Sequence, residues 1–274
     1  MSNICRCKSA AKLYISEKQI SITQHCKCIF MDLTRKPVSK NYNAPIASLQ
    51  EAYQSISREL APAAVVGNWA LRLSLFDNAS WDTSSIEIAL AHKPKPGSLK
   101  SLMRQGYKQE ECEEREDGSE RRVVLKPENG YSISVTMVYD KSGSAYMYGI
   151  PTSAMFYNSI DMEVPKVRIA SKKVMLSYEL LAARSARTES DSRTANEHTY
   201  AAYRLLEGLY NLNISDFIVD LVNVSKSAHR ALYNTSRIGS TKQPERAKAS
   251  WPDISSIAII AEEALKLHSM IRGS

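Results

Sequence analysis

The sequence predicts an α/β fold in which a mixed sheet is flanked by helices and is followed by a C-terminal helical half. Short apolar or alternating segments, which are typical of strands, are interleaved with amphipathic helical segments up to residue 170. From residue 171 onward the periodicity is helical. This order is the one expected of a sheet domain with a helical cap. We therefore expect an extension with little regular structure (1–43), an α/β domain (44–170) and a helical domain (171–274).

The α/β part opens with a helix, a strand and a second helix. Apolar residues recur at helical spacing across 44–60, and Pro45 suits the first turn of that helix. Pro62 ends the helix, and the apolar segment 63–66 predicts a short buried strand. Gly67 then provides a tight turn into a second helical pattern.

The remaining strands follow from alternation and from turn signals. Residues 86–90 alternate as in a half-buried strand, and a short helix after them is expected to end at Gly106. The dipeptide Asp117-Gly118 favours a type I′ turn between two strands, because both positions tolerate positive φ. Further strands are expected at 131–139 and 164–169, and the C-terminal helices at 171–187, 195–211, 214–233 and 253–272.

Four of the five cysteines form two Cys-x-Cys pairs in the N-terminal extension, Cys5 with Cys7 and Cys26 with Cys28. Four thiolates can complete a tetrahedral zinc shell. Structural zinc sites usually separate paired cysteines by about two to four residues, and the spacing here is tighter. The sequence therefore does not favour zinc. The first 30 residues also show neither helical nor strand periodicity.

Composition and charge limit the partners to be expected. No apolar run approaches the roughly 18 residues needed to span a bilayer, and no secretory signal is evident. We therefore expect an intracellular, cytoplasmic protein with no membrane partner. The formal net charge of +7 suits anionic partners. Lys and Arg are scattered rather than gathered on one helical face, so a nucleotide or protein partner is favoured over nucleic acid.

Two short motifs follow one another along the chain, AAVVGNWAL at 63–71 and IEIAL at 86–90. Their order resembles the opening of the minimal nucleotidyltransferases, including the abortive-infection toxins. In that family a strand enters a Gly-Gly or Gly-Ser turn, a short helix follows, and the next strand carries Asp-x-Asp. Residues 99–107 and 167–184 are similar to later elements of the family. The resemblance covers roughly residues 45–210 and implies a nucleotidyltransferase-like sheet.

The resemblance also implies where a catalytic site would lie. Nucleotidyl transfer uses two magnesium ions, which are held by carboxylates on adjacent strands. In this sequence Ser85 and Glu87 stand where the family has its two Asp residues. Strand 133–137 offers only Ser134 and Thr136 for the third carboxylate. Glu87 is thus the candidate metal ligand, and the site is interpreted as degenerate because one acidic ligand rarely holds two metals.

The residues at the phosphate-binding positions of the family motif also differ from the family, and the differences again weaken the predicted site. A glycine turn lets backbone N–H groups approach phosphates at a helix N-terminus, and Gly67 and Asn68 are the candidates for that role. Trp69 would fill space that a triphosphate needs unless it lies in the core, which is the favoured interpretation. Glu179 stands where the family usually has a lysine facing the site. The cations that would bind a nucleotide are Lys173, Arg184 and Arg187.

These observations support two functional hypotheses. The first is a catalytically degenerate nucleotidyltransferase-fold protein that serves as a binding or regulatory module. The second is an active, magnesium-dependent nucleotidyltransferase with a rearranged site centred on Glu87. In that case Glu87, Ser85 and Asp82 are the candidate catalytic residues, with Asp140 as an alternative carboxylate. Asp82 is otherwise interpreted as a turn or cap residue. An unrelated enzyme or a structural protein is the remaining alternative.

Overall fold

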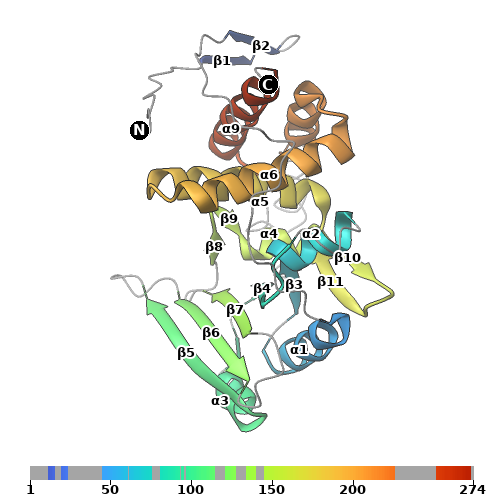
Figure 1. Ribbon diagram of the computed structural model, residues 1–274, viewed down its shortest axis with the longest axis vertical. Helices are drawn as coiled ribbons and strands as arrows, with labels where there is room; N and C mark the ends of the chain where they lie inside the picture. The colour runs from blue at the N-terminus through green and yellow to red at the C-terminus, as the bar shows by residue number, and fades with distance from the viewer. Residues whose placement is uncertain are drawn as a thin grey trace, which may run out of the picture.

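A computed structural model of the protein confirms an α/β fold, in which a mixed sheet is flanked by helices and followed by a helical half (Figure 1). The residues that it describes are 12–15, 20–23, 45–60, 62–75, 81–92, 94, 95, 97–114, 121–127, 134–139, 145–225 and 251–272. Within these residues the helices and strands follow the predicted order, and several short elements are added to it.

The main sheet has seven strands in the described part of the chain, in the order β10-β11-β3-β4-β7-β6-β5. Its centre consists of β3 (Ala63–Val66), β4 (Ser85–Leu90) and β7 (Ser134–Tyr139). β3 and β4 pair antiparallel, whereas β4 and β7 pair parallel. The parallel pairing places Ser85 beside Ser134, so β4 and β7 begin at the same edge of the sheet.

Two hairpins complete the sheet on its outer sides. Their strands are β5 (Tyr107–Glu114), β6 (Arg121–Pro127), β10 (Ser159–Met162) and β11 (Val167–Ala170). In the first hairpin Glu113 pairs with Arg122 and Glu114 with Arg121, so an acidic strand end lies opposite a basic one. The predicted turn at residues 117–118 lies outside the described residues.

Helices in the α/β part are α1 (Ile46–Glu59), α2 (Gly67–Leu75), α3 (Ser98–Arg104) and α4 (Thr152–Tyr157). α2 is the most central of them, because nearly all of its residues are buried against β3, β4 and α5. Trp69 on this helix has no exposed surface and lies in the core, which confirms the interpretation made from the sequence.

The helical half consists of α5 (Lys172–Thr188), α6 (Ser192–Tyr210), a helix that covers residues 214–225, and α9 (Ile254–Arg272). α5 and α6 pack along each other across one end of the sheet, and α9 packs on α5 (Figure 1). Asp191 caps α6, since its Oδ1 accepts a hydrogen bond from the backbone N–H of Thr194 at 3.0 Å. None of the described helices is long and apolar enough to cross a membrane.

The structure contains short elements that the sequence did not predict. β8 (Tyr146–Met147) and β9 (Ile150–Pro151) form a small hairpin, and β1 (Lys12–Ile15) pairs with β2 (Ile20–Thr23) in the N-terminal segment. The expected strand 164–169 begins only at Val167, because residues 163–166 form the turn between β10 and β11. Strands of two to four residues are too short to show a period. The four N-terminal cysteines lie outside the described residues.

Candidate functional site

The site implied by the sequence lies where β3 passes into α2 beside β4. Gly67, the first residue of α2, has a φ of +62°. Glu87 on β4 pairs with Val66 on one side and with Thr136 of β7 on the other. Adjacent strands therefore bring Glu87 to the glycine turn, as the sequence implies. Ser85 lies two residues earlier on the same strand and is half-buried.

The carboxylate of Glu87 lies directly on Gly67. A Cβ atom built on Gly67 would be 2.5 Å from Oε2 of Glu87 and 3.0 Å from its Cδ. Real side chains do not tolerate such a contact, so only glycine can stand at this position while Glu87 keeps its place. We name the space on the Cα of Gly67, into which a Cβ would project, the Gly67 seat. A carboxylate of the chain itself fills this seat.

Tyr178 of α5 holds Glu87 in that position. Its hydroxyl donates a hydrogen bond to Oε2 of Glu87 at 2.5 Å. The side chain of Tyr178 is only 1% exposed, and burial, reinforced by the nearby charge of Glu87, raises the pKa of the phenol well above its usual value. The hydroxyl therefore keeps its proton at neutral pH and acts as a donor to the carboxylate.

The next residue on α5, Glu179, is paired with His198 of α6. Nδ1 of His198 lies 2.7 Å from Oε2 of Glu179, whose side chain is 2% exposed. Oε1 of Glu179 is buried without a hydrogen-bond partner. Burial raises the pKa of Glu179, and the charge of Glu87 adds to the rise, although His198 opposes it. Glu179 thus lies close enough to Glu87 to interact with it, where the family resemblance leads one to expect a lysine.

Three rings surround this pair of carboxylates. Tyr148, in the turn between β8 and β9, lies edge-on to Tyr178 at 5.2 Å between ring centroids and edge-on to His198 at 6.1 Å. Tyr148 is 41% exposed, so it forms the surface of the site, whereas Tyr178 forms its floor. Burial lowers the pKa of His198, but the carboxylates of Glu179, Glu87 and Glu197 together outweigh this and raise it.

Asp82 is bound within its own turn. Its Oδ1 accepts a hydrogen bond from the backbone N–H of Ser84 at 2.9 Å, which is the geometry of an Asx turn. This is the turn role that the sequence allowed for Asp82. Asn68 is exposed on α2, beside the buried Gly67. Asp140 lies outside the described residues.

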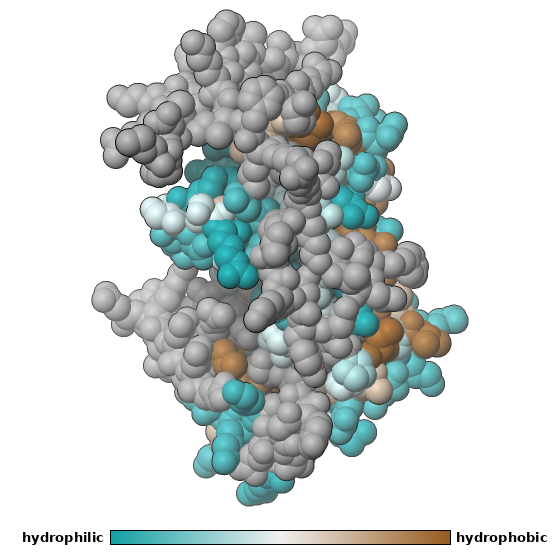
Figure 2. Space-filling model, viewed as in Figure 1, coloured by the Kyte–Doolittle hydropathy of each residue, from teal (hydrophilic) through white to brown (hydrophobic). Residues whose placement is uncertain are grey.

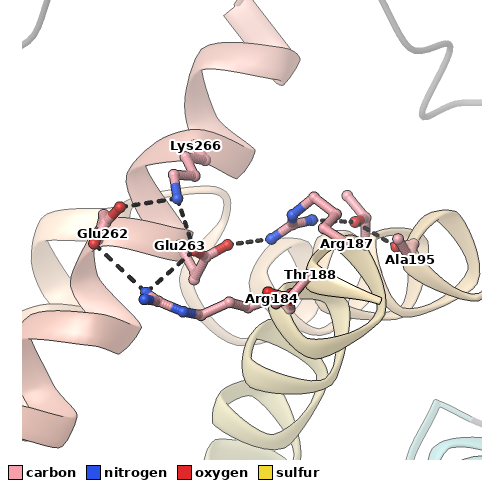
Figure 3. A network of polar contacts seen from close by, with 8 residues as sticks. Arg184, Arg187, Thr188, Ala195, Glu262, Glu263 and Lys266 are labelled. Carbon is pink, nitrogen blue, oxygen red and sulfur yellow. Dashed lines mark hydrogen bonds and ion pairs between the residues drawn. The ribbon is translucent and has the colours of Figure 1, made fainter. Parts of the chain in front are cut away.

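The three predicted cations face other partners. Lys173 forms an ion pair with Asp220. Arg187 binds Glu263 of α9, and Arg184 Nη1 lies 3.6 Å from both Glu262 and Glu263 (Figure 3). Oε1 of the buried Glu263 also accepts a hydrogen bond from Nζ of Lys266 at 2.8 Å. The structure therefore does not bring these cations to Glu87: the two arginines tie α5 to α9 instead.

Some of these contacts could not be found from the sequence. The sequence singles out Glu179 for its position, but it does not indicate the hydrogen bond between Glu179 and His198. Tyr178 was not singled out for the site. The available signal was its place beside Glu179 in the helix that follows the last strand of the resemblance.

The described residues do not fit a two-metal centre. They contain no group of three or more His, Cys, Asp or Glu side chains that could hold a metal ion. Glu87, the candidate ligand, already accepts a hydrogen bond through Oε2. Magnesium with one or two carboxylates would depend on phosphates of a substrate for its other ligands.

Comparisons with known proteins give likenesses of structure only. No family model matches the sequence, and no curated protein matches it significantly. The structure of the polyadenylate synthase of Megavirus is similar with a TM-score of 0.39 and 12% sequence identity. The similarity covers 63% of this chain and 36% of the synthase chain, so this chain spans about a third of the length of that protein. A protein of H. pylori described as a nucleotidyltransferase has a TM-score of 0.39 and 14% identity over 83% of this chain and 95% of its own.

The antibiotic-resistance factor ANT(2'')-Ia, whose solution structure is known, has a TM-score of 0.41 and 12% identity over 70% of this chain and 94% of its own. Likenesses at this level carry no functional assignment. The functional proposal therefore rests on the strand pairing and the side chains described above.

Proposed function

We propose that this chain is a nucleotidyltransferase-fold protein that has lost the metal centre of that fold and serves as a binding or regulatory module. The strand pairing supports the first part of the proposal. A strand enters a glycine turn and a helix, the next strand runs antiparallel to it, and a third strand runs parallel to the second. The family motif needs this arrangement in order to bring carboxylates together on adjacent strands.

The observation that carries the proposed loss of the metal centre is that Glu87 is the one carboxylate among the four strand positions that correspond to the family motif, 85, 87, 134 and 136. Position 85 has a serine, and the residues of β7 in register with Ser85 and Glu87 are Ser134 and Thr136. Hydroxyl groups do not supply the negative charge that a hard divalent cation requires. Two metal ions cannot be held by Glu87 alone, so two-metal phosphoryl chemistry has no support here.

The charges around Glu87 also support the proposal that the site does not bind a metal-free triphosphate. Glu179 adds a second carboxylate, whereas Lys173, Arg184 and Arg187 are paired with Asp220, Glu262 and Glu263. The cationic group that interacts with Glu87 is His198, whose pKa is raised by Glu179 and, to a smaller extent, by Glu87. A triphosphate without metal ions would meet a site with the wrong sign of charge.

The experiment is a thermal-shift titration of the full chain with ATP, CTP, GTP and UTP, each with magnesium and with EDTA. Wild type, Glu87→Ala and the control Glu163→Ala are compared, since Glu163 is exposed in the turn between β10 and β11. We expect no magnesium-dependent rise in the melting temperature of the wild type. A rise that requires magnesium and is lost only in Glu87→Ala would refute the proposal and support an active transferase centred on Glu87.

A further inference from the structure

The side chains around Glu87 include a buried acceptor that no group of the described chain satisfies. Oε2 of Glu179 is bonded to His198, but Oε1 of the same carboxylate is buried and accepts no hydrogen bond. The side chain of Glu179 is 2% exposed. A buried carboxylate oxygen without a donor costs free energy, so folded proteins rarely keep one unless a water molecule or a ligand supplies the donor. This oxygen therefore indicates a donor from outside the chain.

The charges around this oxygen favour a cation as the donor. Glu87 and Glu179 interact electrostatically, and Glu197 on α6 adds a third carboxylate that acts on His198. His198 is the opposing cationic group, and the carboxylates outnumber it. Carboxylates that lie close together repel one another, and a cation bound beside them relieves the repulsion. The same charges repel a phosphate, in agreement with the proposed function.

The ring of Tyr148 lies over the carboxylates on the outer side. It is 41% exposed and lies edge-on to both Tyr178 and His198. Tyr148 has a φ of +51° and Gly149 a φ of +83°, as in a two-residue hairpin turn that usually has Asn, Asp or Gly at its first position. A bulky residue is unfavourable there, and backbone strain of this kind gathers at ligand-binding sites. The turn thus places an aromatic ring beside the two carboxylates at a cost in strain.

We propose that these side chains bind a guanidinium group, with Glu179 and Glu87 as acceptors and Tyr148 as the ring on which the guanidinium stacks. The inference rests on the proposed function, because it concerns the same site, and it names the chemical class of the ligand. A guanidinium suits the site better than an ammonium ion does, because it is planar and weakly hydrated and carries several N–H donors in one plane. Since Oε1 of Glu179 is buried, Tyr148 turns outward as the guanidinium enters, and such rotamer changes are common on binding.

The guanidinium can belong to an arginine side chain of a protein partner or to a small compound. Tyr146, two residues before Tyr148, is 48% exposed on the same hairpin. Tyrosine is enriched where proteins bind one another. A peptide can contact Tyr146 as well as the site, whereas a small guanidinium compound contacts the site alone. The two sources are therefore distinguished by the effect of Tyr146 on affinity.

The test follows binding by NMR in EDTA, with no nucleotide, through the imidazole ¹⁵N signals of the full-length protein. The His198 signal is assigned by its loss in His198→Gln. The ligands are methylguanidinium and a capped Ala-Ala-Arg-Ala-Ala peptide, with peptides that carry citrulline or lysine in place of arginine as controls. We expect the arginine peptide to shift the His198 signal, and to bind at least about tenfold more tightly than the citrulline peptide and about threefold more tightly than the lysine peptide.

Variants of the site test the named contacts. Glu179→Gln should weaken binding of the arginine peptide about tenfold, and Tyr148→Leu about threefold, because they remove a charged acceptor and the stacking ring. The control Glu163→Ala should stay within about twofold of wild type. An advantage of the peptide over methylguanidinium that Tyr146→Ala removes identifies a protein side chain as the source, and equal affinities identify a small compound.

Circular dichroism and thermal melts identify variants that do not fold, and Tyr148→Leu, at an exposed side chain in a turn, then supplies the answer if Glu179→Gln is one of them. The inference is overturned if the arginine peptide leaves the His198 signal unchanged, if the citrulline or lysine peptide binds equally well, or if the folded site variants bind like wild type. These outcomes concern a cation in EDTA. The proposed function is tested with nucleotides and magnesium, so the two can fail separately.

Discussion

Substitution of Gly67 by alanine tests directly whether the Glu87 carboxylate lies on the glycine. Two costs arise. An alanine with a φ of +62° costs roughly 1–2 kcal/mol in backbone strain. The new Cβ would also stand 2.5 Å from Oε2 of Glu87, so the carboxylate must leave and the buried hydroxyl of Tyr178 loses its acceptor. An unpaired buried group costs about 1–3 kcal/mol, so the total is about 2–5 kcal/mol.

The assay is urea denaturation of four proteins that form a double-mutant cycle: wild type, Gly67→Ala, Glu87→Ala and the double variant. In the Glu87→Ala background the seat is empty and Tyr178 has already lost its acceptor. We therefore expect Gly67→Ala to cost only about 1–2 kcal/mol there, for the backbone strain alone. The coupling free energy between the two positions should thus be about 1–3 kcal/mol.

A matched control separates strain from contact. Gly106 has a φ of +89°, and a Cβ built on it meets nothing within 4 Å. Gly106→Ala should therefore cost about 1–2 kcal/mol whether or not Glu87 is present. The refuting result would be additivity: the loss in free energy of unfolding of the double variant would equal the sum of the losses of Gly67→Ala and Glu87→Ala to within about 0.5 kcal/mol. The carboxylate of Glu87 would then not lie on Gly67.

Two further predictions concern the ion pairs of Glu263 between α5 and α9, and the pair formed by His198 and Glu179. Glu263→Gln leaves Arg184, Arg187 and Lys266 around a neutral buried side chain, and should lower the free energy of unfolding by about 2–4 kcal/mol in urea titrations. Glu262→Gln, at a side chain that is 36% exposed, should cost less than about 1 kcal/mol, and equal costs would contradict the special role of Glu263. Because the folded-state pKa of His198 is raised, its contribution to stability is present below pH 6.5 and is lost as the pH rises through the folded-state pKa. The free energy of unfolding should therefore fall over that range in wild type and His92→Gln, and an equal fall in His198→Gln would contradict this assignment.

The backbone of the site could be predicted from the sequence because its elements have strong local signals. The apolar segment 63–66 followed by Gly67 predicts a strand and a turn, and the alternation in β4 predicts which residues share a face with Glu87. These signals act over a few residues. The positions of Gly67 and Glu87 follow from them once β3 and β4 pair, which is favoured because the two strands are consecutive along the chain.

The side chains that complete the site could not be predicted in the same way. Tyr178 lies 91 residues after Glu87, and their hydrogen bond depends on how α5 crosses the sheet. α5 is also buried on most of its circumference, so its periodicity does not show which face meets the sheet. The sequence analysis names Arg184 and Arg187 as cations for a nucleotide, whereas in the structure both form ion pairs with Glu263 on α9.

The exposed apolar side chains do not indicate a second functional site on the part of the surface that Figure 2 shows. Figure 2 shows a mainly hydrophilic surface over the exposed end of α6, and hydrophobic residues near the hairpin of β10 and β11, where Ile160 is 47% and Val164 is 85% exposed. This hairpin lies at the far edge of the sheet from β7. Isolated exposed apolar residues of this kind are common on soluble domains.

The charge arrangement around Glu87 explains how two neighbouring carboxylates are held at this point of the fold. In a metal centre, several carboxylates are held together only because the metal neutralises them. Here Glu87 is stabilised by the hydroxyl of Tyr178 and lies at the N-terminus of α2, while Glu179 is stabilised by His198. Each remaining carboxylate thus has a donor within the chain. The side chains at this site therefore stabilise one another through hydrogen bonds within the chain.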